Sequence, residues 1–505
     1  MTVKVMHRLL ALIMTIIMLA SINTAFAADD GYPSSYTYNY DYWSDIRESP
    51  DAYRVDQVLY SGDLGLEVSM KKPQSLFVRD NDIYVCDTGN NRILQIHREG
   101  NAYSLTRIID TIQGCDVNTF NTPNDVFVDV DHNIYVADTN NGRVVMVDKE
   151  LNFLKEFTKP NDATFDQSLS FMPNKVVADV SGRIFVLATN VNKGLVKFEA
   201  DTTFTGFIGA NKVKYNFFEY MWKQYFTTKE QRAQQESFVP TEYCNIYIDD
   251  DSFIYATNIV FSEYDLLSDA AQPIRRLNGI GNDILIKNDR YPPIGDLYWV
   301  EQVEAQGPSK FVDITTLEND IYIALDRTRG RIFGYDSQGI MLWAFGNTGN
   351  SEGSFNSAIA IDHMDKDLFV LDQNEGNITV FRPTEYGNLI YQASEEYLRG
   401  DYDGSAETWE DVLKMNANYN LAFIGIGRSL LRQEKLTEAM EYFEMAYDRD
   451  NYGRAFRLYR KVWVEENIGW LVLVLAAVMI IPLVKRTINK MRMEVEAYER
   501  NQVKK

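Results

Sequence analysis

Cysteine and histidine are scarce in this sequence of 505 residues, which contains 3 cysteines and 4 histidines. Cys86, Cys115 and Cys244 cannot form a disulfide framework, and no C-x-x-C pair supplies a redox or metal site, so we expect inert thiols. Basic residues are also few relative to acidic ones: 50 Lys and Arg against 72 Asp and Glu give a net charge of −22. A chain this acidic repels phosphate backbones, which excludes nucleic acid as an expected partner.

Catalytic fingerprints are absent as well. The sequence has no P-loop, no G-x-S-x-G, no H-E-x-x-H and no dinucleotide-binding motif. Long apolar runs are few. The first, Leu9–Ala20, follows Lys4, His7 and Arg8 and precedes the small-residue site Ala25–Ala27. This pattern predicts a secretory signal peptide over residues 1–27, with an uncleaved membrane anchor as the alternative.

The second apolar run is Ile468–Val484, which as a helix spans about 25 Å. Trp470 and the basic residues from Lys485 onward extend it at the membrane interfaces, so it predicts a transmembrane helix over 468–484. A buried core helix is the alternative, but the run has no polar face. Combined with the signal peptide, it predicts a type I membrane protein with residues 28–467 outside the cell and a cytoplasmic tail at 485–505.

A repeated segment fills most of the region between these runs. "DNDIYVCDTGNNRILQIH" (80–97) recurs as "DHNIYVADTNNGRVVMVD" (131–148), and each copy alternates with period two between turn residues. The six copies begin near Pro73, Pro123, Pro173, Pro240, Pro308 and Phe355. A fourth strand is expected in "LTRIIDTI", "NFLKEFT", "TTFTGFIG" and "IMLWAFG". Four-stranded units repeated radially predict a β-propeller.

The segments "IYVCDTGNNRI" and "IYVADTNNGRV" resemble the NHL-repeat family, which implies a six-bladed propeller over 53–383. The segment from Tyr53 to Gly65 precedes the first copy as a fourth strand would, so we expect it to pair with the last blade and close the ring. Asp87 and Arg92 are five residues apart, as are Asp138 and Arg143. Their repetition predicts a structural turn, with Asp accepting turn amides and Arg pairing nearby, rather than catalysis.

Two insertions interrupt the repeats. Within the insertion at 209–238, five apolar residues follow helical spacing and form a candidate interaction surface, with packing filler as the alternative. They are Phe217, Phe218, Met221, Trp222 and Tyr225. The second insertion, Tyr291–Gly307, could cap one propeller face. The Tyr-rich segment 28–52 receives no structural assignment.

After Pro383 the pattern becomes helical. Residues 386–463 superpose on themselves at 34 residues, with Tyr402 on Leu436 and Trp409 on Phe443. This is the period of tetratricopeptide (TPR) repeats, so the sequence predicts TPR-like helical hairpins. The expected fold is thus mainly β, a six-bladed NHL-type propeller followed by TPR-like hairpins and one transmembrane helix.

Relatives of NHL propellers include lactonases and lyases that hold a divalent metal in the central channel. Gluconolactonase-like propellers bind Ca²⁺ with Glu, Asn and Asp, and "PND" resembles one of their segments. By that resemblance, Asn124, Asn174 and Glu242, which follow opening prolines, are candidate ligands for Ca²⁺ or another divalent ion. A solvated channel lining is the alternative, because the ligand set is incomplete and no general base is evident.

The histidines do not predict a zinc or lyase site in the central channel. His97 is expected to end a third strand, and His132 and His363 are expected in turns, so none is expected at the start of an inner strand. The sequence therefore favours a non-enzymatic, membrane-anchored extracytoplasmic scaffold that binds a protein or glycan and needs no cofactor. The layout resembles membrane-anchored bacterial NHL proteins linked with carbohydrate ABC transporters. The alternative is an extracellular metal-dependent hydrolase or lactonase.

Overall fold

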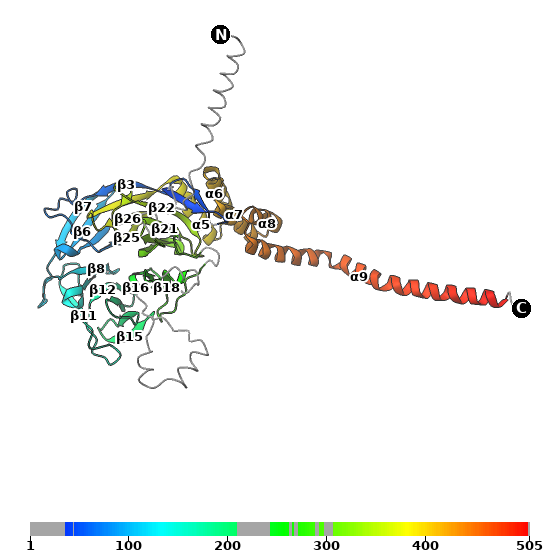
Figure 1. Cartoon of the computed structure of the whole chain (residues 1–505), viewed down its shortest axis with the longest axis horizontal. Helices are drawn as coiled ribbons and strands as arrows, with labels where there is room; N and C mark the ends of the chain where they lie inside the picture. Colours follow the sequence, from blue (N-terminus) through cyan, green and yellow to red (C-terminus); the bar gives the residue numbers. More distant parts are fainter. Residues whose placement is uncertain are drawn as a thin grey trace, which may run out of the picture. The chain divides into compact units, whose positions relative to one another are not determined.

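The computed structural model describes residues 36–43, 45–209, 243–261, 265–266, 271–287, 292–296 and 307–502. The chain divides into two compact units between Asn388 and Leu389. The first unit contains six antiparallel sheets that follow one another round a ring in chain order (Figure 1). This is a six-bladed β-propeller, as the repeat predicts.

The first three blades are four-stranded sheets whose strands follow the chain. Blade one contains β4 (Ser75–Arg79), β5 (Asp82–Asp87), β6 (Arg92–Glu99) and β7 (Ala102–Ile109). Blade two contains β8 (Pro123–Val128), β9 (Ile134–Asp138), β10 (Arg143–Val147) and β11 (Phe153–Thr158). Blade three contains β12 (Pro173–Ala178), β13 (Ile184–Ala188), β14 (Leu195–Phe198) and β15 (Phe204–Ile208). The expected fourth strands of these blades are confirmed.

The remaining blades depart from this plan in different ways. Blade four has three described strands, β16 (Tyr243–Ile248), β17 (Ile254–Asn258) and β18 (Ile274–Leu277). Blade five contains β19 (Phe311–Thr316), β20 (Tyr322–Asp326), β21 (Arg331–Tyr335) and β22 (Met341–Phe345). Blade six contains β25 (Ala358–Met364), β26 (Asp367–Asp372), β27 (Asn377–Pro383) and an N-terminal strand, β3 (Tyr53–Leu59).

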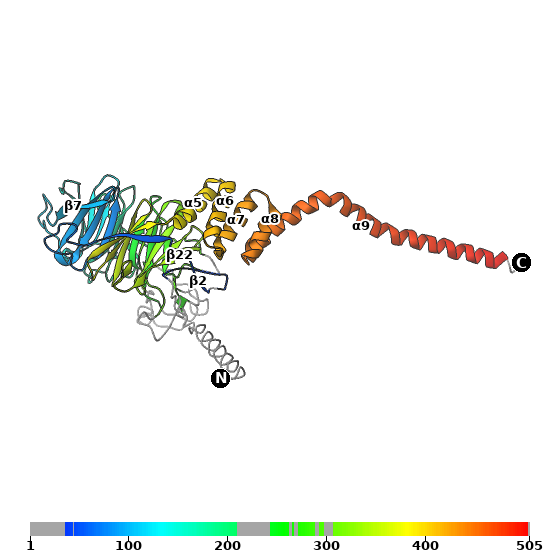
Figure 2. The ribbon, with the colours of Figure 1, turned by 90° about the horizontal axis from the view of Figure 1, so that it is seen from above.

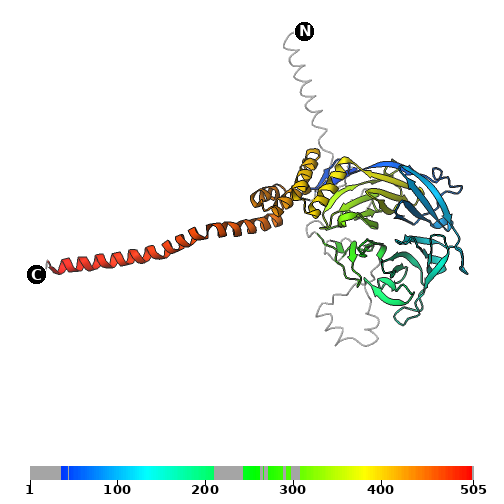
Figure 3. The same cartoon turned by 180° about the vertical axis from the view of Figure 1, so that it is seen from behind.

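Strand β3 closes the ring. It pairs antiparallel with β27, with Val58 opposite Thr379 and Leu59 opposite Ile378. The inner strands β4, β8, β12, β16, β19 and β25 contact one another in a closed cycle. The ring of blades is also seen from behind (Figure 3). The predicted closure through residues 53–65 is therefore confirmed for the strand that ends at Leu59.

The Tyr-rich segment, which the sequence left unassigned, extends blade five. Strand β1 (Thr37–Tyr40) pairs with β22, and β2 (Ile46–Glu48) pairs with β1. This blade therefore has six strands. Strands β2 and β22 are labelled in Figure 2. Trp343 on β22 needs room beside β21, because a Cβ on Gly334 would lie 2.5 Å from its ring. Between blades five and six, β23 (Asn347–Thr348) pairs parallel with β24 (Ser354–Phe355).

The core lies between the sheets. Strands β9, β13 and β20 are buried along their whole length. The buried side chains, mostly Val, Ile, Leu and Phe, form clusters that join neighbouring blades. The repeated Asn and Gly turn positions also have a physical cause. Asn91 has φ 53° and Gly142 has φ 67° at the same repeat position, a left-handed conformation that Asn and Gly adopt most readily.

The second unit is helical. Its elements are α5 (Glu385–Arg399), which begins in the first unit, α6 (Tyr402–Met415), α7 (Asn420–Arg432), α8 (Leu436–Met445) and α9 (Arg449–Gln502). Helices α6 and α8 begin 34 residues apart, and Gly400 and Glu434 both have positive φ before them. Gly427 on α7 lets the Phe443 ring approach, because a Cβ there would lie 2.7 Å from it. The hairpin period is confirmed, whereas TPR-family membership stays a prediction.

Helix α9 is continuous over 54 residues, so the end of the predicted hairpin region, the predicted membrane span and the first part of the tail form one element. Within Arg449–Ala497 it contains a stretch of mean hydropathy 2.5 that is unburied and long enough to cross a membrane. Pro482 lies inside this stretch. Among the described residues this is the one helix that meets these criteria.

Candidate functional site

Six residues occupy one equivalent position on the inner strands and are called the inner ring below. Each pairs with the residue just before the last position of the second strand, as Asp125 pairs with Ala137 and Lys175 with Leu187. The inner ring consists of Ser75, Asp125, Lys175, Asn245, Asp313 and Ala360. Five of the six are polar, so this is the natural place to look for chemistry.

The carboxylates of the inner strands join one blade to the next. Asp125 accepts the backbone N–H of Val176 at 2.9 Å, and Asp313 accepts that of Ile361 at 2.7 Å. Asp362 lies on β25, two residues after the inner-ring residue Ala360, and its carboxylate accepts the N–H of Val78 at 2.7 Å. Inner strands of neighbouring blades share no backbone ladder, so the buried N–H groups of Val176 and Ile361 and the partly buried N–H of Val78 need side-chain acceptors. The carboxylates therefore have a structural function.

Side-chain bonds continue this linkage. Ser75 Oγ donates to Asp125 Oδ1 at 2.6 Å, and the Asn245 amide donates to the Asp313 carboxylate. Lys175 Nζ lies 3.4 Å from Asp125 Oδ1, and only 12% of the lysine side chain is exposed, so this ion pair is largely shielded from water. Lys175 and Asp313 were not among the site residues expected from the sequence. The signal was available, because Ser75, Asp125 and Lys175 each stand two residues after an opening proline.

The buried charges of the inner ring shift one another's protonation. Burial by itself lowers the pKa of the Lys175 ammonium, but the carboxylates of Asp125 and Asp313 more than offset it, so the pKa is raised from its ordinary value. Burial raises the pKa of Asp313 to about 7, although Lys175 and the N–H groups of Ile361 and Ile314 act in the opposite direction. An ammonium with a raised pKa is a cation at neutral pH and a poor nucleophile.

The candidate metal ligands are partly brought together. Asn124 Nδ2 donates to Asn174 Oδ1 at 3.1 Å, so these two amides lie side by side on neighbouring blades. Glu242 lies outside the described residues. No group of three or more His, Cys, Asp or Glu side chains gathers as a metal site in the part of the chain that the structure describes. The metal site at Asn124, Asn174 and Glu242 stays a prediction.

The expectation for His363 is wrong. It was placed in a turn, but it lies within inner strand β25, opposite Leu368. Its Nδ1 is 2.8 Å from Thr315 Oγ1 on β19, and that hydroxyl also donates to Asp362 Oδ1 at 2.8 Å. Thr315 is fully buried and already bonded to the carboxylate, so the three groups join blades five and six.

The strand-end motif has the expected structural function. Asp87 accepts the N–H of Lys71 at 2.7 Å and pairs with Arg92 Nε at 2.7 Å. The following Thr88 hydroxyl donates to the carbonyl of Pro123 at 2.7 Å, on the next blade. In blade two, Asp138, Arg143 and Thr139 repeat all of these roles. The Asp carboxylate therefore fixes the loop that enters its own blade, and the Thr hydroxyl bonds its blade to the first strand of the next one.

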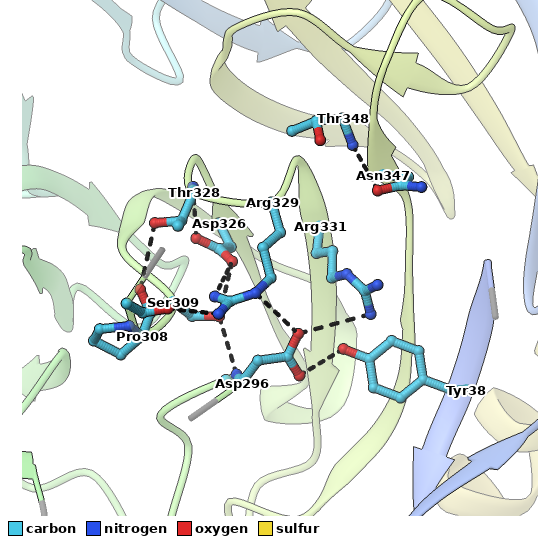
Figure 4. A network of polar contacts seen from close by, with 12 residues as sticks. Tyr38, Asp296, Pro308, Ser309, Asp326, Thr328, Arg329, Arg331, Asn347 and Thr348 are labelled. Atoms are coloured by element: carbon cyan, nitrogen blue, oxygen red, sulfur yellow. Dashed lines mark hydrogen bonds and ion pairs between the residues drawn. The ribbon is translucent and has the colours of Figure 1, made fainter. Parts of the chain in front are cut away.

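Blade five uses its Arg residues differently. Arg331 Nη1 points to Asp296 Oδ2 at 3.7 Å, and Arg329 lies between Asp296 and Asp326 (Figure 4). Tyr38 on β1 donates to Asp296 Oδ1 at 2.7 Å, and its ring faces the Arg331 guanidinium, 4.6 Å away. Two buried acids and two buried guanidiniums thus anchor the Tyr-rich strand. Because these groups are at most 1% exposed, the network is structural.

The candidate interaction surface lies outside the described residues. This applies to Phe217, Phe218, Met221, Trp222 and Tyr225. The signal peptide over residues 1–27 lies outside them as well. These assignments stay predictions.

No protein-family model matches the chain, and no curated protein matches it either. Among solved structures, virginiamycin B lyase from Staphylococcus aureus is 10% identical, with a TM-score of 0.39 over 66% of this chain and 100% of that one. A streptogramin B lyase is 12% identical, with a TM-score of 0.36 over 69% and 86%. A protein of unknown function from Bacteroides thetaiotaomicron VPI-5482 is 12% identical, with a TM-score of 0.40 over 62% and 70%. Likenesses this distant assign this chain neither an activity nor a family, and NHL membership stays a prediction.

Proposed function

We propose that this protein is a membrane-anchored binding protein that presents its propeller and helical hairpins outside the cytoplasm to a protein or glycan partner. The observation that carries the proposal is the use of the inner-strand carboxylates. Asp125, Asp313 and Asp362 each bond to the backbone of the next blade. Groups committed in this way hold the ring together rather than perform acid–base chemistry.

Two further features support the proposal. Lys175 supplies a fixed positive charge beside Asp125, which opposes the entry of a metal cation into the inner ring. The apolar stretch of α9 supplies the anchor, and helical hairpins such as α5–α6 and α7–α8 are common protein-binding elements. A membrane complex, including a carbohydrate transporter, is one partner that this layout would suit.

Cross-linking in native membranes tests the proposal. A photo-reactive residue is placed at exposed propeller positions, one at a time, in the full-length protein, and cross-linked species are identified by mass spectrometry. We expect a specific adduct at neighbouring positions on one face. A binding function would be contradicted if no variant gave a cross-linked species and the purified protein hydrolysed a lactone substrate.

A metal-dependent hydrolase is the second candidate, and the contact between Asn124 and Asn174 favours it. If these amides and Glu242 hold Ca²⁺, the ion should stabilise the protein by about 2.7 kcal/mol at a hundredfold excess over its dissociation constant. Glu242→Gln should abolish that gain. We expect no Ca²⁺-dependent change in melting temperature, and a Ca²⁺ gain that Glu242→Gln removes would favour the hydrolase.

A further inference from the structure

A polar cleft lies between the link from blade five to blade six and the outer strands of blade six. It has a volume of about 830 Å³, within the usual range for a small-molecule site. One wall is the loop from Gly349 to Asn356, the other is the end of β3 up to Tyr60, and β27 supplies Asn377 and Thr379. All of these elements belong to the propeller unit.

The loop that forms one wall is held in place. Gly349 N donates to Phe355 O at 3.1 Å, and the hydroxyls of Ser351 and Ser354 lie 2.9 Å apart. Gly353 has φ 80°, and a Cβ there would lie 2.7 Å from the hydroxyl of Tyr36. Tyr36 in turn donates to the Gly353 carbonyl at 3.2 Å. The wall is therefore pre-organised, which reduces the entropic cost of binding.

Two buried polar groups open onto the cleft without a partner. Asn377 is 8% exposed and Thr379 is 4% exposed, and both line the cleft. Neither side chain has a hydrogen-bonding partner among the described residues. Their neighbours Ile378 and Val380 face the apolar core instead. Buried amide and hydroxyl groups are normally bonded, so these two are available to a ligand.

The chemistry of the lining selects the ligand class. Apart from glycines, Val58 and Tyr60, every lining residue is Asp, Glu, Asn, Gln, Ser or Thr, and none is Lys, Arg or His. This composition disfavours an apolar ligand, which would leave polar groups unpaired. It also disfavours an anion, which would meet four carboxylates and no positively charged side chain in the lining. Tyr60 has 53% of its surface exposed, so its ring can stack on a flat apolar face.

We propose that this cleft binds a neutral oligosaccharide. Sugar hydroxyls donate to carboxylates and exchange bonds with amides and hydroxyls such as Asn377 and Thr379, while Tyr60 stacks against a pyranose face. The inference rests on the proposed binding function and names the ligand class for it. The carboxylates also suit a cationic peptide, but the stacking ring and the unpaired amide and hydroxyl favour the sugar.

Calorimetry on the full-length protein in detergent micelles tests the proposal. The probes are maltotetraose, cellotetraose and N-acetylchitotetraose, with tetralysine as the cationic comparison. We expect at least one tetrasaccharide to bind and Thr379→Val to weaken it roughly 10-fold, because the variant removes the hydroxyl at nearly constant volume. The matched control is Thr205→Val, which makes the same change at an exposed position of β15 in blade three.

A second variant, at the exposed Tyr60, keeps the test valid if Thr379→Val fails to fold. Tyr60→Ala should weaken the same tetrasaccharide and leave the melting temperature unchanged. The proposal is overturned if no tetrasaccharide binds, if tetralysine binds instead, or if binding survives both Thr379→Val and Tyr60→Ala. A specific membrane cross-link without saccharide binding would overturn this inference alone and leave the proposed function standing.

Discussion

Asp138 illustrates how a residue that resembles a catalytic acid serves the fold. Its carboxylate is fully buried, accepts the N–H of Asn121 at 2.8 Å and pairs with Arg143 Nε at 3.0 Å. Arg143 also donates to the carbonyl of Val117 at 2.6 Å. One side chain thus positions the loop that enters blade two.

Replacing Asp138 with alanine should destabilise the propeller by about 3–5 kcal/mol, because it leaves a buried guanidinium without its main counter-charge. Urea unfolding followed by tryptophan fluorescence measures the change. Asp131→Ala, at an exposed turn position of the same blade, is the control and should stay within about 0.5 kcal/mol of the parent protein. Equal losses for both variants would contradict a structural function of Asp138.

Asp313 makes the stability depend on pH. Burial raises its pKa from 3.8 to about 7, so the folded chain holds a proton that the unfolded chain releases within this range. Stability therefore falls as pH rises whenever the folded state binds more protons. The contribution of Asp313 is fully favourable below the ordinary pKa of 3.8, decreases as pH rises above it and is lost as pH rises through about 7.

The substitution Asp313→Asn should remove this dependence. We expect the melting temperature of the variant, relative to the parent protein, to increase steadily between pH 4 and pH 7. Asp131→Asn makes the same change at an exposed position and serves as the control. A difference that stays constant or decreases over this range would show that burial does not hold the proton on Asp313.

At the scale of elements, ring closure depends on one strand from the N-terminal side. Strand β3 covers the edge of β27 through six paired positions. Without it, β27 would present an unpaired edge, and such edges recruit other chains. Strands β1 and β2 cover β22 in the same way, but blade five already has four other strands.

Two truncations separate these contributions. Removal of residues 28–60 should abolish cooperative melting or cause aggregation, because blade six loses its outer strand. Removal of residues 28–50 should retain cooperative melting at a lower temperature, since β3 remains. Differential scanning calorimetry and size-exclusion chromatography measure both outcomes, and identical behaviour of the two truncations would contradict closure through β3.

At the scale of the whole molecule, one helix carries both the end of the hairpin unit and the apolar stretch. Helix α9 has 54 residues, which correspond to about 80 Å. Basic residues flank the stretch on both sides, among them Arg460, Lys461, Lys485 and Arg486, so charge alone does not orient it. The proposed orientation depends on the predicted signal peptide.

A reporter fused after Lys505 should therefore be active only in the cytoplasm, and protease added to intact cells should digest the propeller. The control is the same fusion without residues 1–27, whose propeller should resist the protease because it is never exported. An external reporter, or a propeller that resists digestion in the intact chain, would reverse the proposed topology.

The sequence alone determined the features that are periodic or local. The 50-residue spacing located the first three blades, the strand-end Asp residues marked the turns, and the 34-residue offset located the hairpins. Ring closure through Tyr53–Leu59 was also predictable, because that segment stands where a fourth strand is required. These features follow from hydrophobic alternation and turn chemistry, which act between residues close in the chain.

Only the tertiary structure decided which distant residues meet. Tyr38 and Asp296 are 258 residues apart, and Asp362 and Val78 are 284 residues apart, so no local pattern links them. The same holds for the placement of Lys175 beside Asp125, and for the cleft between the 349–356 loop and β27. Strand periodicity fixes which face a residue takes, but closure of the ring fixes its neighbours, and the candidate sites depend on those neighbours.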